Sequence, residues 1–144
     1  MKGLILHDQL CFAVHTASRA LDALYRRELA ELGLTYPQYL VMLVLWERER
    51  ASVKELGAAL RLDSGTLSPL LKRLEAAGLV RRERDPGDER SVLVRPTAEG
   101  ARLRERAEPV PLRLVAATGL SREDLGDLRR ILDRLTGSLS EAVS

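Results

Sequence analysis

A pair of short helices in the middle of the chain constrains the fold more than any other feature of the sequence. Ser52 and Glu55 form a capping-box pattern, which predicts a first helix that ends at about Leu60. A turn over residues 61–63 leads to a second helix, predicted over residues 64–77. Two short helices joined in this way are typical of a helix-turn-helix, although an ordinary helical hairpin shows the same pattern.

The second helix has signals at both ends and a leucine-rich side. Asp63 or Ser64 can cap its amino end, and Gly78 supplies the left-handed conformation that ends it. The leucines that can face a core are Leu67, Leu70, Leu71 and Leu74. Two short strands are predicted next, at residues 79–83 (LVRRE) and 91–95 (SVLVR), joined by the turn-forming sequence DPGDER. A helix-turn-helix followed by a basic hairpin is a winged helix, which favours DNA binding over a plain helical hairpin.

The outward side of the second helix and the hairpin carry the residues that we expect to contact double-stranded DNA. Short hydroxyls at a helix amino end can approach a base edge or a phosphate, and the positive helix end attracts phosphate. In the hairpin, Arg90 can enter a narrow minor groove, and Asp88 can brace the loop by pairing with an arginine. The predicted DNA-binding residues are Ser64, Thr66, Ser68, Pro69, Lys72, Arg73, Asp88 and Arg90. Taken alone, the hairpin charges are better explained by a solvated surface, and the preceding helix-turn-helix is what favours DNA binding.

Two helices are predicted before the winged helix. Asp8 is expected to cap a first helix that runs to about residue 31 and is closed by Gly33. Thr35 and Gln38 then start a helix that is apolar on nearly all sides until its charged end. A helix of that kind belongs in a core or at a subunit interface.

Two more helices are predicted after the hairpin. One starts at residues 96–99 (PTAE) and is interrupted or kinked by Pro109 and Pro111. The last starts at Ser121 and Asp124, and its apolar residues form one stripe: Leu125, Leu128, Ile131, Leu132, Leu135 and Leu139. The terminal helices exceed what a small winged domain needs for a core. We therefore expect them to pair with a second copy of the chain, the alternative being that they fold back on their own domain.

The predicted fold class is mainly α with a small β-hairpin, a winged helix-turn-helix with terminal helices that form a dimerisation region. A single domain is expected over residues 1–144. Within it, residues 1–34 and 109–144 are the predicted dimerisation helices, and residues 35–108 form the core, with the DNA-binding winged helix-turn-helix at 51–96. Two-fold association also suits a palindromic DNA site.

Composition limits the classes of function. Apolar residues make up 45% and charged residues 31% of the 144-residue chain, as is ordinary for a soluble domain. The sequence contains no run of about 18 apolar residues and no signal peptide, so neither a membrane span nor a membrane partner is expected. The single cysteine, Cys11, cannot form an internal disulfide, which fits a reducing cytoplasm. A net charge of +2 permits a nucleic-acid partner without demanding one.

The segment LRLDSGTLSPLLKRLEAAGLVRRERDPGDERSVLVRPTAEG resembles the core of MarR-family regulators. Asp88-x-Arg90 and the helix start at Pro96-Thr97 match that family's pattern, except that proline stands where leucine is usual. The stretches QLCFAVHTASR, LTYPQYLVMLVLWE and LDSGTLSPLLKRLE are similar to the organic hydroperoxide-sensing subgroup, called OhrR. The resemblance implies a homodimeric repressor that releases its operator when an organic hydroperoxide oxidises its amino-terminal cysteine.

The same resemblance implies which residues sense the oxidant. The reactive cysteine falls on Cys11, and two tyrosines that hydrogen-bond it from the partner subunit fall on Tyr25 and Tyr36. A third tyrosine, usual in part of the subgroup, is replaced by His15, which either contributes to sensing or is a packed or surface histidine. The chain resembles the one-cysteine type, so a small cellular thiol is expected to form a mixed disulfide with the oxidised sulfur. Excess peroxide would instead carry the sulfur to sulfinic or sulfonic acid.

Elementary chemistry supports a reactive thiol without requiring one. A helix amino end and tyrosine donors both favour thiolate, whereas a lone cysteine in an apolar helix is usually a buried hydrophobe. Tyr25 and Tyr36 can likewise be plain packing residues. A repressor released by a small apolar or phenolic ligand is the alternative function, and a thiol peroxidase is a more distant one. We expect no enzyme activity, cofactor or metal site, because Cys11 and His15 are too few ligands for a metal.

Overall fold

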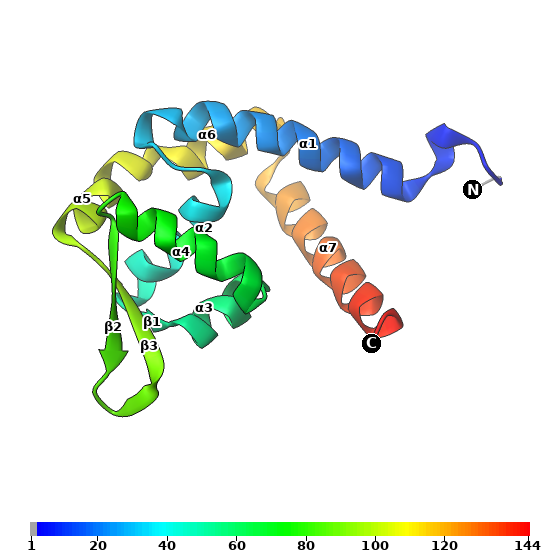
Figure 1. Ribbon diagram of the computed structural model, residues 1–144. Helices are drawn as coiled ribbons and strands as arrows, with labels where there is room; N and C mark the ends of the chain where they lie inside the picture. The colour runs from blue at the N-terminus through cyan, green and yellow to red at the C-terminus, as the bar shows by residue number, and fades with distance from the viewer. Residues whose placement is uncertain (1–2) are drawn as a thin grey trace. The chain divides into compact units, whose positions relative to one another are not determined.

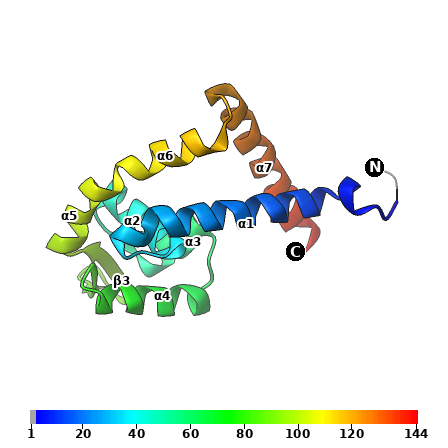
Figure 2. The ribbon, with the colours of Figure 1, turned by 90° about the horizontal axis from the view of Figure 1, so that it is seen from above.

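The computed structural model describes residues 3–144 and divides into two compact units, Met1–Val110 and Pro111–Ser144 (Figures 1 and 2). The first unit contains the 3-10 helices η1 (Leu6–Asp8) and η2 (Ala30–Leu32), the helices α1 (Leu10–Leu29), α2 (Tyr36–Arg48), α3 (Val53–Leu60), α4 (Ser64–Ala76) and α5 (Ala98–Ala107), and the strands β1 (Ala51–Ser52), β2 (Val80–Asp85) and β3 (Asp88–Pro96). Helix α6 (Pro109–Thr118) crosses the unit boundary, and α7 (Arg122–Ala142) lies in the second unit. The mainly helical fold class with a small hairpin is confirmed.

The strands form one antiparallel sheet in the order β1-β3-β2. Strands β2 and β3 pair from Val80 opposite Pro96 towards the hairpin end, and both are longer than the sequence predicts. Strand β1, which pairs Ala51 with Val94, was not predicted. Two residues are too few to leave an alternating pattern in the sequence.

Most predicted helix caps are confirmed. Thr35 and Ser52 form capping boxes, Asp63 caps α4 and Ser121 caps α7, in each case by accepting a backbone N–H three residues later. The prediction for Asp8 is wrong, because this residue ends the 3-10 helix η1 and therefore lacks the extended backbone of a cap. Gln9 is the N-cap residue of α1, and its side chain donates to two carbonyls of the preceding segment instead of capping the helix.

The core of the first unit is built around α2. Five of its residues are buried, as expected for a helix that is apolar on nearly all sides: Tyr39, Val41, Met42, Val44 and Leu45. The four leucines of α4 that were predicted to face a core, Leu67, Leu70, Leu71 and Leu74, are buried as well. By contrast, Leu29 is the one buried residue of α1, whose amino-terminal part extends away from the rest of this unit in Figures 1 and 2.

No single helix within residues 3–144 is long and apolar enough to cross a membrane. The segments Leu10–Leu32 and Tyr36–Arg48 reach the required length and composition only as a pair bent by 65°, and much of α2 is core.

Gly100 of α5 provides a test of the packing between this helix and the segment before β2. A Cβ atom at Gly100 would lie 2.0 Å from the backbone oxygen of Leu79, which has no flexible end that can move aside. We expect Gly100→Ala to lower the free energy of unfolding by about 3 kcal/mol, as overpacking against backbone does. Gly137→Ala is the control, since its Cβ would meet nothing within 4 Å in an exposed helix, and it should stabilise by about 0.5–1 kcal/mol. Urea denaturation measures both, and a Gly100→Ala variant as stable as wild type contradicts the packing.

Candidate functional site

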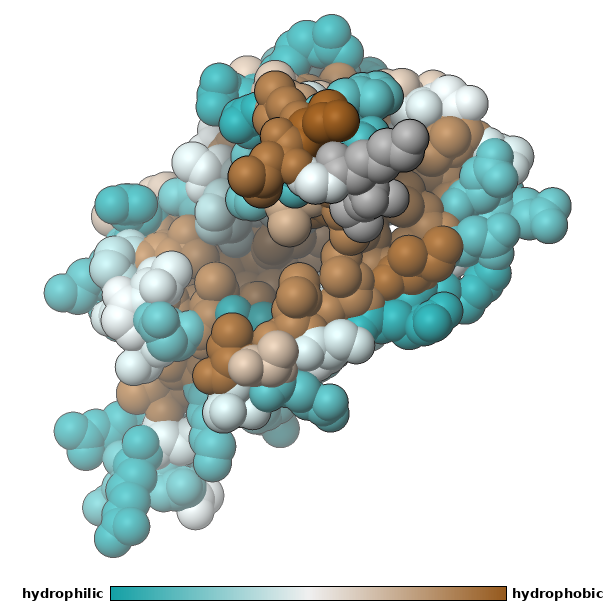
Figure 3. Space-filling model, turned by 90° about the vertical axis from the view of Figure 1, so that its right-hand side faces the viewer, coloured by the Kyte–Doolittle hydropathy of each residue, from teal (hydrophilic) through white to brown (hydrophobic). Residues whose placement is uncertain are grey.

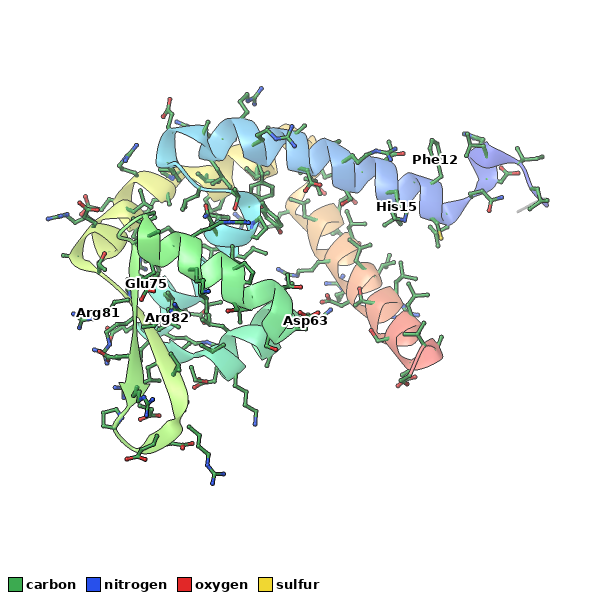
Figure 4. All side chains as sticks on the ribbon, in the orientation of Figure 1. Phe12, His15, Asp63, Glu75, Arg81 and Arg82 are labelled. Carbon is green, nitrogen blue, oxygen red and sulfur yellow. The ribbon has the colours of Figure 1, made fainter. Side chains whose placement is uncertain are left out.

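The outward face of α4 carries short polar and cationic side chains. All six residues predicted from this helix to contact DNA are exposed: Ser64, Thr66, Ser68, Pro69, Lys72 and Arg73. The start of the helix is fixed by Asp63, whose Oδ1 accepts the backbone N–H of Thr66 at 2.7 Å (Figure 4). That hydrogen bond is the main reason that the pKa of Asp63 lies below its ordinary value. The helix therefore presents a fixed amino end with hydroxyls in its first turns.

An ion pair joins the other end of α4 to the wing. The guanidinium of Arg82 on β2 donates to Glu75 Oε1 at 3.0 and 3.3 Å, and the backbone N–H of Arg82 donates to Oε2 at 3.3 Å. Figure 4 shows the two side chains at the junction of helix and strand. The Arg82 side chain is the largest cause of the lowered pKa of Glu75. The sequence analysis did not predict this ion pair. It could have been predicted from the positions of Glu75 and Arg82, which are oppositely charged and lie on either side of the turn at Gly78.

The tip of the wing is held by carboxylates that accept backbone N–H groups. Asp85 Oδ1 accepts from Gly87 at 2.9 Å, and Asp88 Oδ1 accepts from the backbone of Arg90 at 3.0 Å. Asp88 was expected to brace the loop by pairing with an arginine, and the hydrogen bond that it accepts comes from the main chain of Arg90. The Arg90 side chain is exposed and takes part in no ion pair among residues 3–144.

Three tyrosines gather where α1 meets α2. The ring centroid of Tyr25 lies 4.5 Å from that of Tyr36 and 5.9 Å from that of Tyr39. Burial is the first cause of the raised pKa of each hydroxyl, and neighbouring tyrosines or, for Tyr36, Asp22 add to it. All three hydroxyls are protonated donors at neutral pH, as tyrosine hydroxyls ordinarily are. Tyr39, which is 3% exposed, was not predicted, although it lies three residues after Tyr36 on one helix.

The cysteine does not belong to this cluster within one chain. Cys11 is the second residue of α1 and is exposed, and His15 is also exposed one turn later. Cys11 precedes Tyr25 by fourteen residues of unbroken helix, which corresponds to about 21 Å at the usual rise. The structure thus brings Tyr25 and Tyr36 together and leaves Cys11 and His15 apart from them. Residues 3–144 contain no group of three or more His, Cys, Asp or Glu side chains that could hold a metal ion.

A pocket of about 410 Å³ adjoins the tyrosine cluster. Tyr36 forms part of its wall, and the charged side chains of Asp22 and Arg26 lie on the wall formed by α1. Leu34, Thr35 and Pro37 supply the rest. Its volume is within the range of pockets that bind small organic molecules.

Comparisons with known proteins identify a family and several relatives of this chain. The model of the MarR family matches residues 34–92. The chain is 51% identical to the HTH-type transcriptional regulator TtmR of Methylorubrum extorquens, over 94% of this chain and 68% of that protein. It is 45% identical to the organic hydroperoxide resistance transcriptional regulator of Bacillus subtilis, over 94% and 92%. AbfR of Staphylococcus epidermidis, 33% identical, has been solved bound to DNA in a reduced form (TM-score 0.81, 96% and 95% covered) and an overoxidised form (TM-score 0.74, 94% and 93%).

The cap at Asp63 predicts a pH effect on stability. Because the pKa of Asp63 is lowered in the folded chain, the carboxylate stabilises the fold above its ordinary pKa of 3.8. This stabilisation is lost as the pH falls through the lowered pKa. Asp63→Asn keeps a capping acceptor that does not titrate, so wild type should lose stability relative to this variant on acidification. Urea denaturation of both proteins from about pH 7 to about pH 3 measures the difference. A difference that stays constant over that range contradicts the lowered pKa.

Proposed function

Because the chain belongs to the MarR family of transcriptional regulators, we propose that it is a dimeric DNA-binding repressor that senses organic hydroperoxides through Cys11. One observation carries the proposal. Tyr25 and Tyr36 form a cluster of protonated donors, while the thiol lies about 21 Å away along the same helix. A second copy of the chain can bring its Cys11 to these tyrosines, which the first copy's own cysteine cannot reach.

Unburied apolar surface supports the dimer. Four of the six stripe residues of α7 are exposed, among them Leu128 at 43% and Ile131 at 56%, and α7 has no buried residue. Leu10, Phe12 and Leu21 of α1 are exposed too. Apolar side chains are visible on the surface in Figure 3, and their burial against a second copy would remove them from water.

The proposed chemistry starts with the thiolate of Cys11. Its sulfur attacks one oxygen of the hydroperoxide, the O–O bond breaks, and the other oxygen leaves as an alcohol after taking a proton. The sulfur is then sulfenic acid. A small cellular thiol attacks that sulfur, giving a mixed disulfide and water. Hydroxyls of the partner's Tyr25 and Tyr36 donate hydrogen bonds to the reduced sulfur, which stabilises the thiolate.

Release of DNA follows from the bulk added to the sulfur. In a dimer the two α4 helices have to match successive major grooves, about 34 Å apart, so a shifted interface weakens binding. A coupling of about 3 kcal/mol weakens binding by more than a hundredfold. Overoxidised AbfR has been solved bound to DNA, and we therefore assign release in this chain to the mixed disulfide rather than to sulfinic or sulfonic acid.

The pocket beside Tyr36 favours a second candidate, a repressor released by a small apolar or phenolic ligand. This candidate predicts release by such a ligand from protein that ignores peroxide. The two candidates therefore differ in whether release requires Cys11.

Cys11→Ser tests the proposed function. The variant should bind operator DNA selected from a random pool as wild type does, because Cys11 lies outside the winged helix. Wild type should release that DNA on treatment with cumene hydroperoxide and cysteine, while Cys11→Ser stays bound. Mobility shifts measure release, and intact mass should show one added thiol on wild-type chains alone. Peroxide-induced release of Cys11→Ser eliminates the mechanism.

Arg90→Ala tests the wing. Loss of the exposed guanidinium should weaken operator binding about tenfold and reduce the slope of log affinity against log salt by about one. Arg129→Ala removes an exposed arginine of α7, outside the winged helix, and should change neither quantity. Unchanged affinity of Arg90→Ala at physiological salt removes this residue from the interface.

A further inference from the structure

A second pocket, of about 400 Å³, lies at the root of the wing, where β2 and β3 meet α2 and α5. Three arginines contribute to its wall: Arg81 of β2, Arg95 of β3 and Arg104 of α5. Glu49 is the one carboxylate in the wall, and Trp46 supplies an aromatic surface. The wall thus carries three positive charges and one negative charge, and Glu83, which contacts Arg81 and Arg95, lowers the excess positive charge to one. Nothing in the proposed sensing or DNA-reading roles uses this cluster.

Arg81 and Arg95 stand directly opposite each other on the paired strands. Like charges in that position repel each other, so a negatively charged group beside them stabilises the strand pair. Glu83 is shared between them, with Oε1 2.8 Å from Arg95 Nε and Oε2 3.9 Å from Arg81 Nε. The contact between Glu83 and Arg95 is an ion pair without the geometry of a hydrogen bond. Arg95 Nε is therefore a buried donor without a hydrogen-bond acceptor. Within residues 3–144, both guanidinium groups have N–H donors without acceptors.

The rest of the wall is held in place. Arg104 Nη1 donates to the backbone oxygen of Trp46 at 3.2 Å, which keeps its guanidinium at the pocket. Trp46 Nε1 donates to the backbone oxygen of Gly100 at 2.8 Å, which fixes the indole against α5. Arg104 and Trp46 therefore keep a defined arrangement.

We propose that this pocket binds the phosphate group of a phosphate monoester. The excess positive charge favours an anion, and planar guanidinium groups match phosphate oxygens in pairs of hydrogen bonds. The pocket has room for more than the phosphate itself, and Trp46 offers a surface to an attached organic group. A backbone phosphate of DNA is a phosphodiester, which offers similar oxygens but carries one negative charge rather than two, and the test distinguishes it from a free monoester.

The experiment uses Trp46, which is the only tryptophan of the chain, as the reporter. Phenyl phosphate should change its fluorescence saturably, and phenol at the same concentration should not. Arg81→Ala should raise the dissociation constant about tenfold or more, because a charge-assisted hydrogen bond is lost. Arg81 is exposed (Figure 4), so its removal should leave the fold intact. Arg84→Ala is the matched control, an exposed arginine of the same strand outside the pocket wall, and should bind phenyl phosphate as wild type does.

Three results would overturn the proposal: no saturable change, equal binding of phenol, or equal loss in both arginine variants. Calorimetry of the same samples checks binding without the fluorescence reporter. Competition then identifies the source. Operator DNA displaces phenyl phosphate if a backbone phosphate occupies the pocket, and both bind together if the natural ligand is a free monoester.

Discussion

Fourteen residues of unbroken helix separate the one thiol of this chain from Tyr25, and this spacing governs how a thiol sensor can be built from it. A helix rises about 1.5 Å per residue, so no local movement of Cys11 brings its sulfur to the tyrosines of the same chain. A site that needs both components has to be assembled from two chains. In the dimer that we propose, modification of the sulfur acts directly on the contact between subunits.

The helix that carries Tyr36 and Tyr39 also connects the tyrosine cluster to α4, the helix that we propose to read DNA. Helix α2 packs against α1 on one side and contacts α3, α4, α5 and β3. Five buried residues fix it in the core, so it moves as a rigid body if it moves at all. A displacement of Tyr36 is therefore transmitted to α4 through a single helix, α2. The Glu75–Arg82 ion pair couples the wing to α4, because it joins the end of that helix to β2.

The sequence predicted features that depend on local chemistry and missed those that depend on tertiary contacts. Capping by Thr35, Ser52 and Ser121 could be predicted because each cap involves residues three positions apart. Asp8 satisfied the same local rule, but the preceding residues form a 3-10 turn that leaves it helical. Strand β1 exists only because β3 lies beside it. The resemblance to a known family predicted Tyr25 and Tyr36 as site residues. Tyr39 could not be predicted in the same way, because its place in the cluster depends on how α1 packs on α2.

The hairpin places its charges differently at its two ends, and the difference bears on specificity. At the tip, Asp88 accepts a hydrogen bond from the main chain of Arg90 and leaves the arginine side chain exposed, as the proposed contact with DNA requires. At the root, Arg81 and Arg95 are held across from each other and share one carboxylate. A mobile cation suits a groove whose width varies with sequence, whereas a fixed cluster suits one compact anion. Occupation of the root would relieve the repulsion between the two strands and stiffen the hairpin, so an anion bound there would change how the tip meets DNA without any contact to a base.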